Sequence, residues 1–265
     1  MSRVALIAAL LVPMVVQAAD APQRKGTAAG GPDWQNEVVT ATGAGAPDLH
    51  APSPAAARLG AENAAKLDAL RNILAKVKGV QVAGGQNVGD KMASDASLSG
   101  HIEGAVKGFK ITAKRYFSDG GVEVDVEVKM ADVLSELVGG GAPSAKVAAV
   151  PSSGSAANSG LVIDAKSLKV QPGLEPRIVD EAGKPVYGPE VVSSDWMKKQ
   201  GVASYLKSLD DAKKSDRVGD KPLVVKALKA NGTDVVISTK DADALRDPKG
   251  NVSYLSEGRV IIVID

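Results

Sequence analysis

The sequence predicts an α+β protein of two small domains, each a mainly antiparallel sheet with packed helices. Three patterns support this fold class: a helical pattern over residues 54–78, an alternating hairpin pattern over 105–130, and short strand patterns within 160–265. A length of 265 residues suffices for one large domain or two small ones. The stretch 139–159, rich in Gly, Ala, Ser and Pro, predicts a flexible linker between domains at 36–138 and 160–265.

The first residues have the pattern of a secretory signal peptide. Arg3 is followed by the uncharged run Val4–Val16 and by small residues up to Ala18, so we expect a signal peptide at 1–18 with cleavage after Ala18. The apolar run is too short to cross a membrane, and a lipid anchor on an exported protein needs a cysteine, which the chain lacks. We therefore expect a periplasmic or secreted protein without a membrane span or lipid anchor. Residues 19–35 are Gly- and Pro-rich and are predicted to be disordered.

The first domain begins with a strand and a long helix. Residues 37–42 predict a short strand that runs into a turn at Gly43–Gly45. Ser53 and Pro54 are an N-cap and a first-turn proline, and Gly79 is suited to end the helix that they begin. The face expected to be buried carries Leu59, Leu67, Leu70, Leu74 and Val77, with Asn63 on the same seam as a core amide.

A hairpin follows the helix. Apolar residues alternate with charged ones from Val122 to Met130 and, more weakly, before residue 117, and residues 118–121 predict a four-residue loop. Pairing Phe117 with Val122 sets a register that places Ala113 opposite Val126 and Lys114 opposite Asp125. Residues 131–138 predict a closing helical turn.

The second domain contains several shorter patterns. Residues 161–163 and 260–264 are apolar runs typical of buried strands, and hairpins are predicted around 181–184 and at Asn231-Gly232. Val202, Leu206 and Leu209 have helical spacing, and residues 241–246 suit a short helix.

Composition excludes several classes of function. The chain has no cysteine, which removes disulfides, thiolate zinc sites and thiol nucleophiles. Its two histidines, His50 and His101, lie in polar, Gly-flanked stretches and do not complete a metal site. Because 32 basic residues balance 31 acidic ones, no overall field attracts nucleic acid. We expect no cofactor, no metal and no nucleic-acid partner.

Three short stretches match known functional motifs only in part or no more often than chance predicts. The glycines at 43 and 45 precede a helix, but Asp48 occupies the third glycine position of a dinucleotide fingerprint. Residues 84–91 approach a phosphate-binding loop, but Asp90 displaces the lysine and no helical pattern follows. Ser204 and Lys207 match Ser-x-x-Lys, of which composition alone predicts roughly two copies. We therefore predict no catalytic, cofactor-binding or metal-binding residues.

Two aromatic residues of the second domain leave two interpretations open. Trp196 and Tyr205 could anchor a partner protein, since such residues dominate binding hot spots. They could instead fill the core of a domain with few aromatic residues, and this second interpretation is favoured.

Several stretches resemble a known family. Several stretches are similar to the N-terminal domain of the small bacterial lipoprotein family related to flagellar assembly protein T: residues 39–46, 53–58, 64–67, 72–74 and 77–80, continued by 108–116 and 119–128. The second region resembles the C-terminal part of long members of this group, in residues 160–165, 175–183, 219–227, 234–238 and 259–265. The resemblance implies an envelope location, no enzymatic activity and, in flagellar members, a role in a ring around the basal body. This chain departs from the family in lacking the lipidated cysteine.

Together these observations predict an exported, non-enzymatic bacterial envelope protein. We expect it to act through contacts with other envelope proteins or with itself, in the assembly or stabilisation of an envelope or flagellar-type complex. The alternative is a soluble periplasmic protein that binds a small ligand between two domains hinged at 139–160. A hydrolase that uses Ser204 and Lys207 is the third hypothesis.

Overall fold

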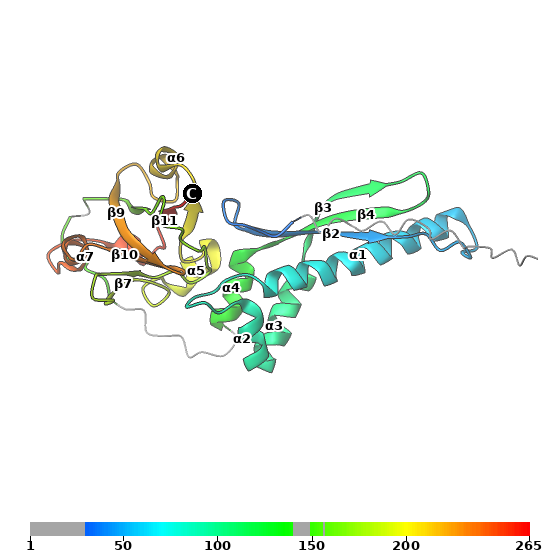
Figure 1. Ribbon diagram of the computed structural model, residues 1–265, viewed down its shortest axis with the longest axis horizontal. Coiled ribbons are helices and arrows are strands. Elements are labelled where there is room, and N and C mark those ends of the chain that lie inside the picture. The colour runs from blue at the N-terminus through cyan, green and yellow to red at the C-terminus, as the bar shows by residue number, and fades with distance from the viewer. Residues whose placement is uncertain (1–29, 140–148, 156) are drawn as a thin grey trace, which may run out of the picture.

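The computed structural model describes residues 30–139, 149–155 and 157–265 (Figure 1). A long arm extends from a body that contains the second domain. The arm is formed by the helix α1 (Pro54–Lys78) with the strands β2 (Val38–Gly45), β3 (Lys110–Tyr116) and β4 (Val122–Lys129) and the loops that join them. The predicted α+β class is confirmed, with one four-stranded and one seven-stranded sheet and helices packed on both. The predicted signal peptide and the linker residues 140–148 lie outside the described residues.

The four-stranded sheet is antiparallel throughout, in the order β1-β2-β4-β3. Its strands are β1 (Pro32–Asp33), β2 (Val38–Gly45), β3 (Lys110–Tyr116) and β4 (Val122–Lys129). The helix α1 (Pro54–Lys78) covers one face of this sheet and packs against β2 and β4 (Figure 1). Residues 30–35, within the segment predicted to be disordered, form β1 and a turn in which Asp33 accepts bonds from two backbone N–H groups. The rest of that segment, 19–29, lies outside the described residues.

The helix α1 has the predicted bounds but buries a different face. Its buried residues are Ala61, Ala65, Ala69, Ile73 and Val77. Of the leucines expected in the core, Leu59 is 60% exposed and Leu67 is 64% exposed, and Asn63 is exposed as well. The predicted face is confirmed only toward the C-terminal end, where Val77 is buried and Leu70 and Leu74 pack against the core. It is wrong toward the N-terminal end, where alanines contact the strand closely and Leu59 and Leu67 lie outside.

The predicted turn at Gly43–Gly45 is also wrong, because both glycines belong to β2. A Cβ atom placed on Gly43 would lie 2.1 Å from the backbone nitrogen of Ala69, and one on Gly45 would lie 2.0 Å from the carbonyl oxygen of Ala61. The helix and strand backbones therefore touch, and only Gly and Ala fit between them.

The hairpin β3–β4 forms, but its register differs from the predicted one. Tyr116, and not Phe117, lies opposite Val122, and a bulge between Ile111 and Ala113 shifts the pairing again. The register was predicted from apolar residues on β3, yet β3 is an edge strand exposed along nearly its whole length. Because few side chains of β3 are buried, core packing does not fix its register. In the observed register the cross-strand neighbours Lys110 and Glu127, and Arg115 and Glu123, form ion pairs.

Two helices that the sequence did not predict precede the hairpin. They are α2 (Val88–Ser94) and α3 (Ala96–Lys107), so the residues from 105 to 107 of the predicted hairpin belong to a helix. A helix does follow the phosphate-loop-like stretch, but its N-terminus is closed by a capping box between Asn87 and Asp90. The hairpin leads into α4 (Met130–Gly139).

The seven-stranded sheet has the order β7-β6-β10-β9-β5-β11-β8. The strands are β5 (Gly160–Asp164), β6 (Ile178–Val179), β7 (Pro185–Tyr187), β8 (Ser204–Leu206), β9 (Pro222–Asn231), β10 (Asp234–Ile237) and β11 (Val260–Val263). The hairpins β6–β7 and β9–β10 are antiparallel as expected, but four other neighbouring pairs are parallel, so the sheet is mixed. The apolar strands β5 and β11 are buried on both faces, as parallel strands usually are.

Short helices complete the second domain: α5 (Ser194–Gln200), α6 (Leu209–Lys214) and α7 (Thr239–Arg246). The helix expected from Val202, Leu206 and Leu209 does not form, because β8 pairs with β11 and α6 begins only after the Ser208 cap. Part of the predicted linker lies against this domain. Val252 donates its N–H to the Pro151 carbonyl (2.8 Å), and the Asn251 amide donates to the Gly154 carbonyl (2.9 Å).

Candidate functional site

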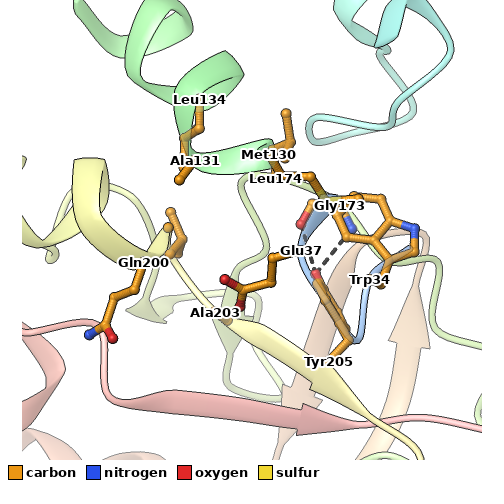
Figure 2. A pocket seen from close by; sticks show the side chains of 12 residues that line it. Trp34, Glu37, Met130, Ala131, Leu134, Gly173, Leu174, Gln200, Ala203 and Tyr205 are labelled. Carbon is orange, nitrogen blue, oxygen red and sulfur yellow. Dashed lines mark hydrogen bonds between the residues drawn. The ribbon is translucent and has the colours of Figure 1, made fainter. Parts of the chain in front are cut away.

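The contact between the two domains contains a small cavity (Figure 2). Its lining comes from both domains, with Trp34, Met130 and Leu134 on one side and Leu174 and Tyr205 on the other. Buried residues of both domains form one continuous apolar cluster across this contact. The domains are therefore joined by a shared core.

A buried arginine organises the polar part of the contact. The Arg217 side chain is 8% exposed, and its guanidinium donates to the carbonyl oxygens of Gly258 (2.9 Å), Gln200 (2.6 Å) and Gly201 (3.3 Å). It also donates to the Ser204 hydroxyl (2.6 Å). Burial lowers the pKa of Arg217, while the charge of Glu37 opposes this shift.

Glu37 brings the first domain to this arginine. Its carboxylate accepts hydrogen bonds from Arg217 (3.2 Å) and from the Ser204 hydroxyl. The residue has φ 56°, a left-handed conformation that side chains rarely adopt, and its carbonyl accepts the Met130 N–H (2.8 Å). The backbone at Glu37 is thus held in a strained turn that directs its side chain toward the second domain (Figure 2).

Aromatic and backbone contacts surround this pair. The Tyr205 hydroxyl donates to the Gly173 carbonyl (2.9 Å) and accepts the N–H of the same glycine (3.0 Å), and burial raises the pKa of this tyrosine. The Trp34 and Tyr205 rings meet edge to face at 5.4 Å. The N–H groups of Leu174 and Glu175 donate to the carbonyls of Gln81 (2.9 Å) and Val82 (3.0 Å) of the first domain.

This joint has room for about one water molecule. The cavity has a volume of about 20 Å³, whereas sites that bind small ligands have volumes of roughly 300–1,000 Å³. Ser204 is bonded to an arginine and a carboxylate that are themselves engaged in holding the domains together. Among the described residues, the polar groups of this contact hold the two domains together and leave no space for a small ligand. A ligand could enter only if the domains separated.

The residues of the Ser-x-x-Lys motif are not brought together for catalysis. Ser204 begins strand β8, and Lys207 follows that strand and is exposed. The motif requires both residues on one helix, with the lysine one turn beyond the serine. Trp196 is half-buried with the Lys199 ammonium 5.1 Å from its ring centre, and Tyr205 is a core residue.

The two histidines lie apart on different elements. His50 is 3.6 Å from Asp48 in the loop before α1, and His101 on α3 is 3.9 Å from Glu136. Within the described ranges, no group of three or more His, Asp or Glu side chains could hold a metal ion. In the same part of the chain, every helix is too short or too polar to cross a membrane.

Sequence reasoning missed the residues that form the joint. Glu37 and Arg217 are 180 positions apart, and Trp34 lies in a segment predicted to be disordered. Arg217 follows a charged stretch that is typical of a solvated helix end. No local signal marks it as buried.

The arm carries most of the large apolar side chains that the described residues expose. Leu49 (88%), Leu59 (60%), Leu67 (64%) and Tyr116 (50%) lie on it, and we call these four the arm patch. The Tyr116 hydroxyl donates to Glu62 on α1 (3.2 Å), and the Arg58 guanidinium lies 5.8 Å from the Tyr116 ring centre. Hydrogen bonds from Lys114 and Lys66 lower the pKa of Glu62 to about 2. The hairpin and the helix are thereby tied together beside the patch.

Two wider hollows lie on the second domain. One, of about 560 Å³, has a polar rim that includes Glu181, Lys229 and Asp234. The other, of about 520 Å³, is more apolar, with Pro151, Leu245 and other apolar residues beside Glu190 and Arg246. The Arg246 guanidinium is bonded to Asp180 (2.8 Å).

Comparison with known protein families gives a match for the second domain only. Residues 160–265 match the family model described as Treponema pallidum Tp0624, second domain. No curated protein matches the chain. The C-terminal domain is thus similar to a domain of the Treponema protein, and the match does not extend to the arm.

Proposed function

We propose that this is an exported, non-enzymatic bacterial envelope protein that acts through protein–protein contacts made by its arm. The observation that carries the proposal is the arm patch: most of the large apolar side chains that the described residues expose lie on the arm, and exposed apolar surface is typical of interaction sites. The signal-like start of the sequence supports export.

The joint between the domains suits a scaffold. Because Glu37, Arg217 and a shared apolar core hold the arm to the body, a partner bound at the arm is held at a fixed position relative to the second domain. A role in assembling or stabilising an envelope or flagellar-type complex rests on the resemblance of the first region to the lipoprotein family related to flagellar assembly protein T.

Site-specific photo-cross-linking in living cells tests this function. A photoreactive residue replaces Leu67 on the arm or, as a matched control of similar exposure, Leu228 on β9. We expect an adduct with an envelope protein, or with this chain itself, only from position 67. Absence of an adduct there, or equal adducts from both positions, would overturn the proposal. Osmotic-shock fractionation and the mass of the mature N-terminus test export.

Small-ligand binding is the second candidate, and the apolar hollow of about 520 Å³ favours it. A thermal-shift screen with metabolites and cell-wall fragments tests it. A hit should be lost in a Leu245→Glu variant that still folds, whereas a screen without a reproducible shift counts against ligand binding.

A further inference from the structure

The strand β2 continues past the end of β1 along one edge of the four-stranded sheet. Within the described residues, β1 pairs with residues 38–39 only, and the Thr40 N–H donates to the Gly31 carbonyl (3.0 Å). Successive residues of a strand direct their backbone groups to opposite sides, so Thr42 and Ala44 direct theirs to the same side as Thr40. These are the groups to which a further strand would bond.

Two polar side chains of α1 bind these backbone groups. The Asn72 amide donates to the Thr42 carbonyl (2.9 Å), and the Asp68 carboxylate accepts the Ala44 N–H (3.0 Å). The Asn72 amide also donates to Asp68 (3.1 Å), so the two side chains hold each other in place. An amide donor and a carboxylate acceptor therefore stand where the N–H and C=O groups of a neighbouring strand would lie.

The sequence of β2 supplies no protection of its own along this edge. Residues 38–45 contain no charge and no proline, and they pair with β4 without a register shift. Natural edge strands are usually interrupted by lysines, prolines or bulges, because an unbroken row of free N–H and C=O groups pairs readily with other chains. The edge of β2 has none of these features, so its protection depends on side chains from another element.

The opposite edge of the same sheet is protected in the usual way. A bulge interrupts β3 between Ile111 and Ala113, and the strand carries Lys110, Lys114 and Arg115. In the part of the chain that the structure describes, side chains of α1 bind backbone groups at the uncharged edge, where the strand itself offers no barrier to pairing.

We propose that Asp68 and Asn72 act as an edge guard, a device built into the arm that keeps strands of other chains from pairing with β2. This inference goes beyond the proposed function, because it does not depend on which partner the arm patch binds. If the two side chains only tied the helix to the strand, removing them would lower stability without causing association. The edge guard predicts that association follows as well.

Amide hydrogen exchange tests the contact itself. In dilute full-length mature protein, Asp68→Ala should raise the exchange rate of the Ala44 amide by roughly tenfold or more, as the loss of a hydrogen bond to a charged group implies. The conservative variant Asp68→Asn keeps an oxygen acceptor at this position and should retain most of the protection. An unchanged rate in Asp68→Ala would mean that another group covers the Ala44 amide, and would overturn the inference.

Sedimentation velocity tests the consequence for association. The double variant Asp68→Ala/Asn72→Ala should associate with itself roughly tenfold more strongly than the wild type, because two backbone groups of an edge strand are released. The control Asn63→Ala, which removes an exposed asparagine from the same helix, should behave as the wild type. Circular dichroism verifies that each variant folds, and the two single variants replace the double one if it does not. Folded variants that associate no more than the wild type would overturn the edge guard.

Cysteine cross-linking locates the edge that pairs, because the chain has no cysteine of its own. In the background of the double variant, Ala44→Cys reports the β2 edge and Ala113→Cys, as a matched control, reports the β3 edge. A bismaleimide should join two chains through position 44 and not through position 113. Equal cross-linking from both edges would show general aggregation and would contradict the inference.

Discussion

The close contact between α1 and β2 makes Gly43 one of the two positions of the arm, with Gly45, where even a methyl group would meet a backbone atom at about 2 Å. In Gly43→Ala, the new methyl group would lie 2.1 Å from the Ala69 nitrogen and 2.3 Å from the Ala65 carbonyl oxygen. Ordinary contacts are about 3.5 Å, so α1 and β2 must separate by more than about 1 Å. Neither contact atom can rotate away, since both belong to the helix backbone.

The cost follows from what the displaced helix buries. Full burial of Ile73 and Val77 is worth about 1.5–3 kcal/mol each, and a gap of 0.5–1 Å forfeits roughly a quarter to a half of the contact energy. Overpacking of a filled site costs typically about 1–3 kcal/mol. We expect Gly43→Ala to lower the free energy of unfolding by about 2–4 kcal/mol, after a gain of about 0.4–1 kcal/mol from the stiffer unfolded chain.

The matched control is Gly60→Ala, on the side of α1 that faces away from β2. Its methyl group meets nothing within 4 Å, and replacing a helical glycine by alanine gains about 1 kcal/mol. Urea unfolding at low protein concentration, followed by circular dichroism at 222 nm (roughly the helix band, which reports α1 strongly), measures both variants. If Gly43→Ala is as stable as the wild type or as Gly60→Ala, the proposed backbone contact is refuted.

Three further predictions concern the joint and two carboxylates. Glu37→Gln leaves buried Arg217 with a weaker partner and should cost about 1–3 kcal/mol in urea unfolding; an unchanged midpoint would contradict a joint held by this pair. Burial raises the pKa of Glu175, so the folded state binds the protonated form of this side chain more favourably than the unfolded state does. This contribution to the free energy of unfolding is present at low pH and is lost as pH rises through the folded-state pKa. Glu175→Gln should therefore raise the melting temperature at pH 7, and the difference should vanish below about pH 4. The hydrogen bond from Arg246 lowers the pKa of Asp180, so Asp180→Asn should lower the melting temperature at pH 7. That difference should fade as pH falls below about 3.9 and through the lowered pKa, and a pH-independent difference would contradict the assignment.

Local signals account for the elements that the sequence predicted well. The helix 54–78 is marked by Ser53, Pro54 and Gly79, which act within a few residues of each end. The hairpin β9–β10 also depends on a local signal, although Asn231 ends β9 and the turn lies at Gly232-Thr233, one residue beyond the predicted Asn231-Gly232. The register of β3 was missed because an exposed edge strand lacks the packing that aligns one pleat with another.

Contacts between distant parts of the chain account for what was missed. The parallel neighbours β5, β9 and β11 come from separate parts of the second domain, and turn signals do not pair them. The joint depends on Glu37 and Arg217, whose separation of 180 residues leaves no pattern along the chain.

The sequence by itself determined where α1 begins and ends and which segments form the hairpins β6–β7 and β9–β10, and composition alone removed cysteine chemistry and any strong overall charge. The tertiary structure decided which face of α1 is buried. Gly43 and Gly45 allow the helix to approach so closely that alanines fill the contact, and Leu59 and Leu67 remain outside. Leu59 and Leu67 of the arm patch are exposed for this reason: the room between two backbones, which no single segment encodes, decides which side chains of α1 a partner can reach.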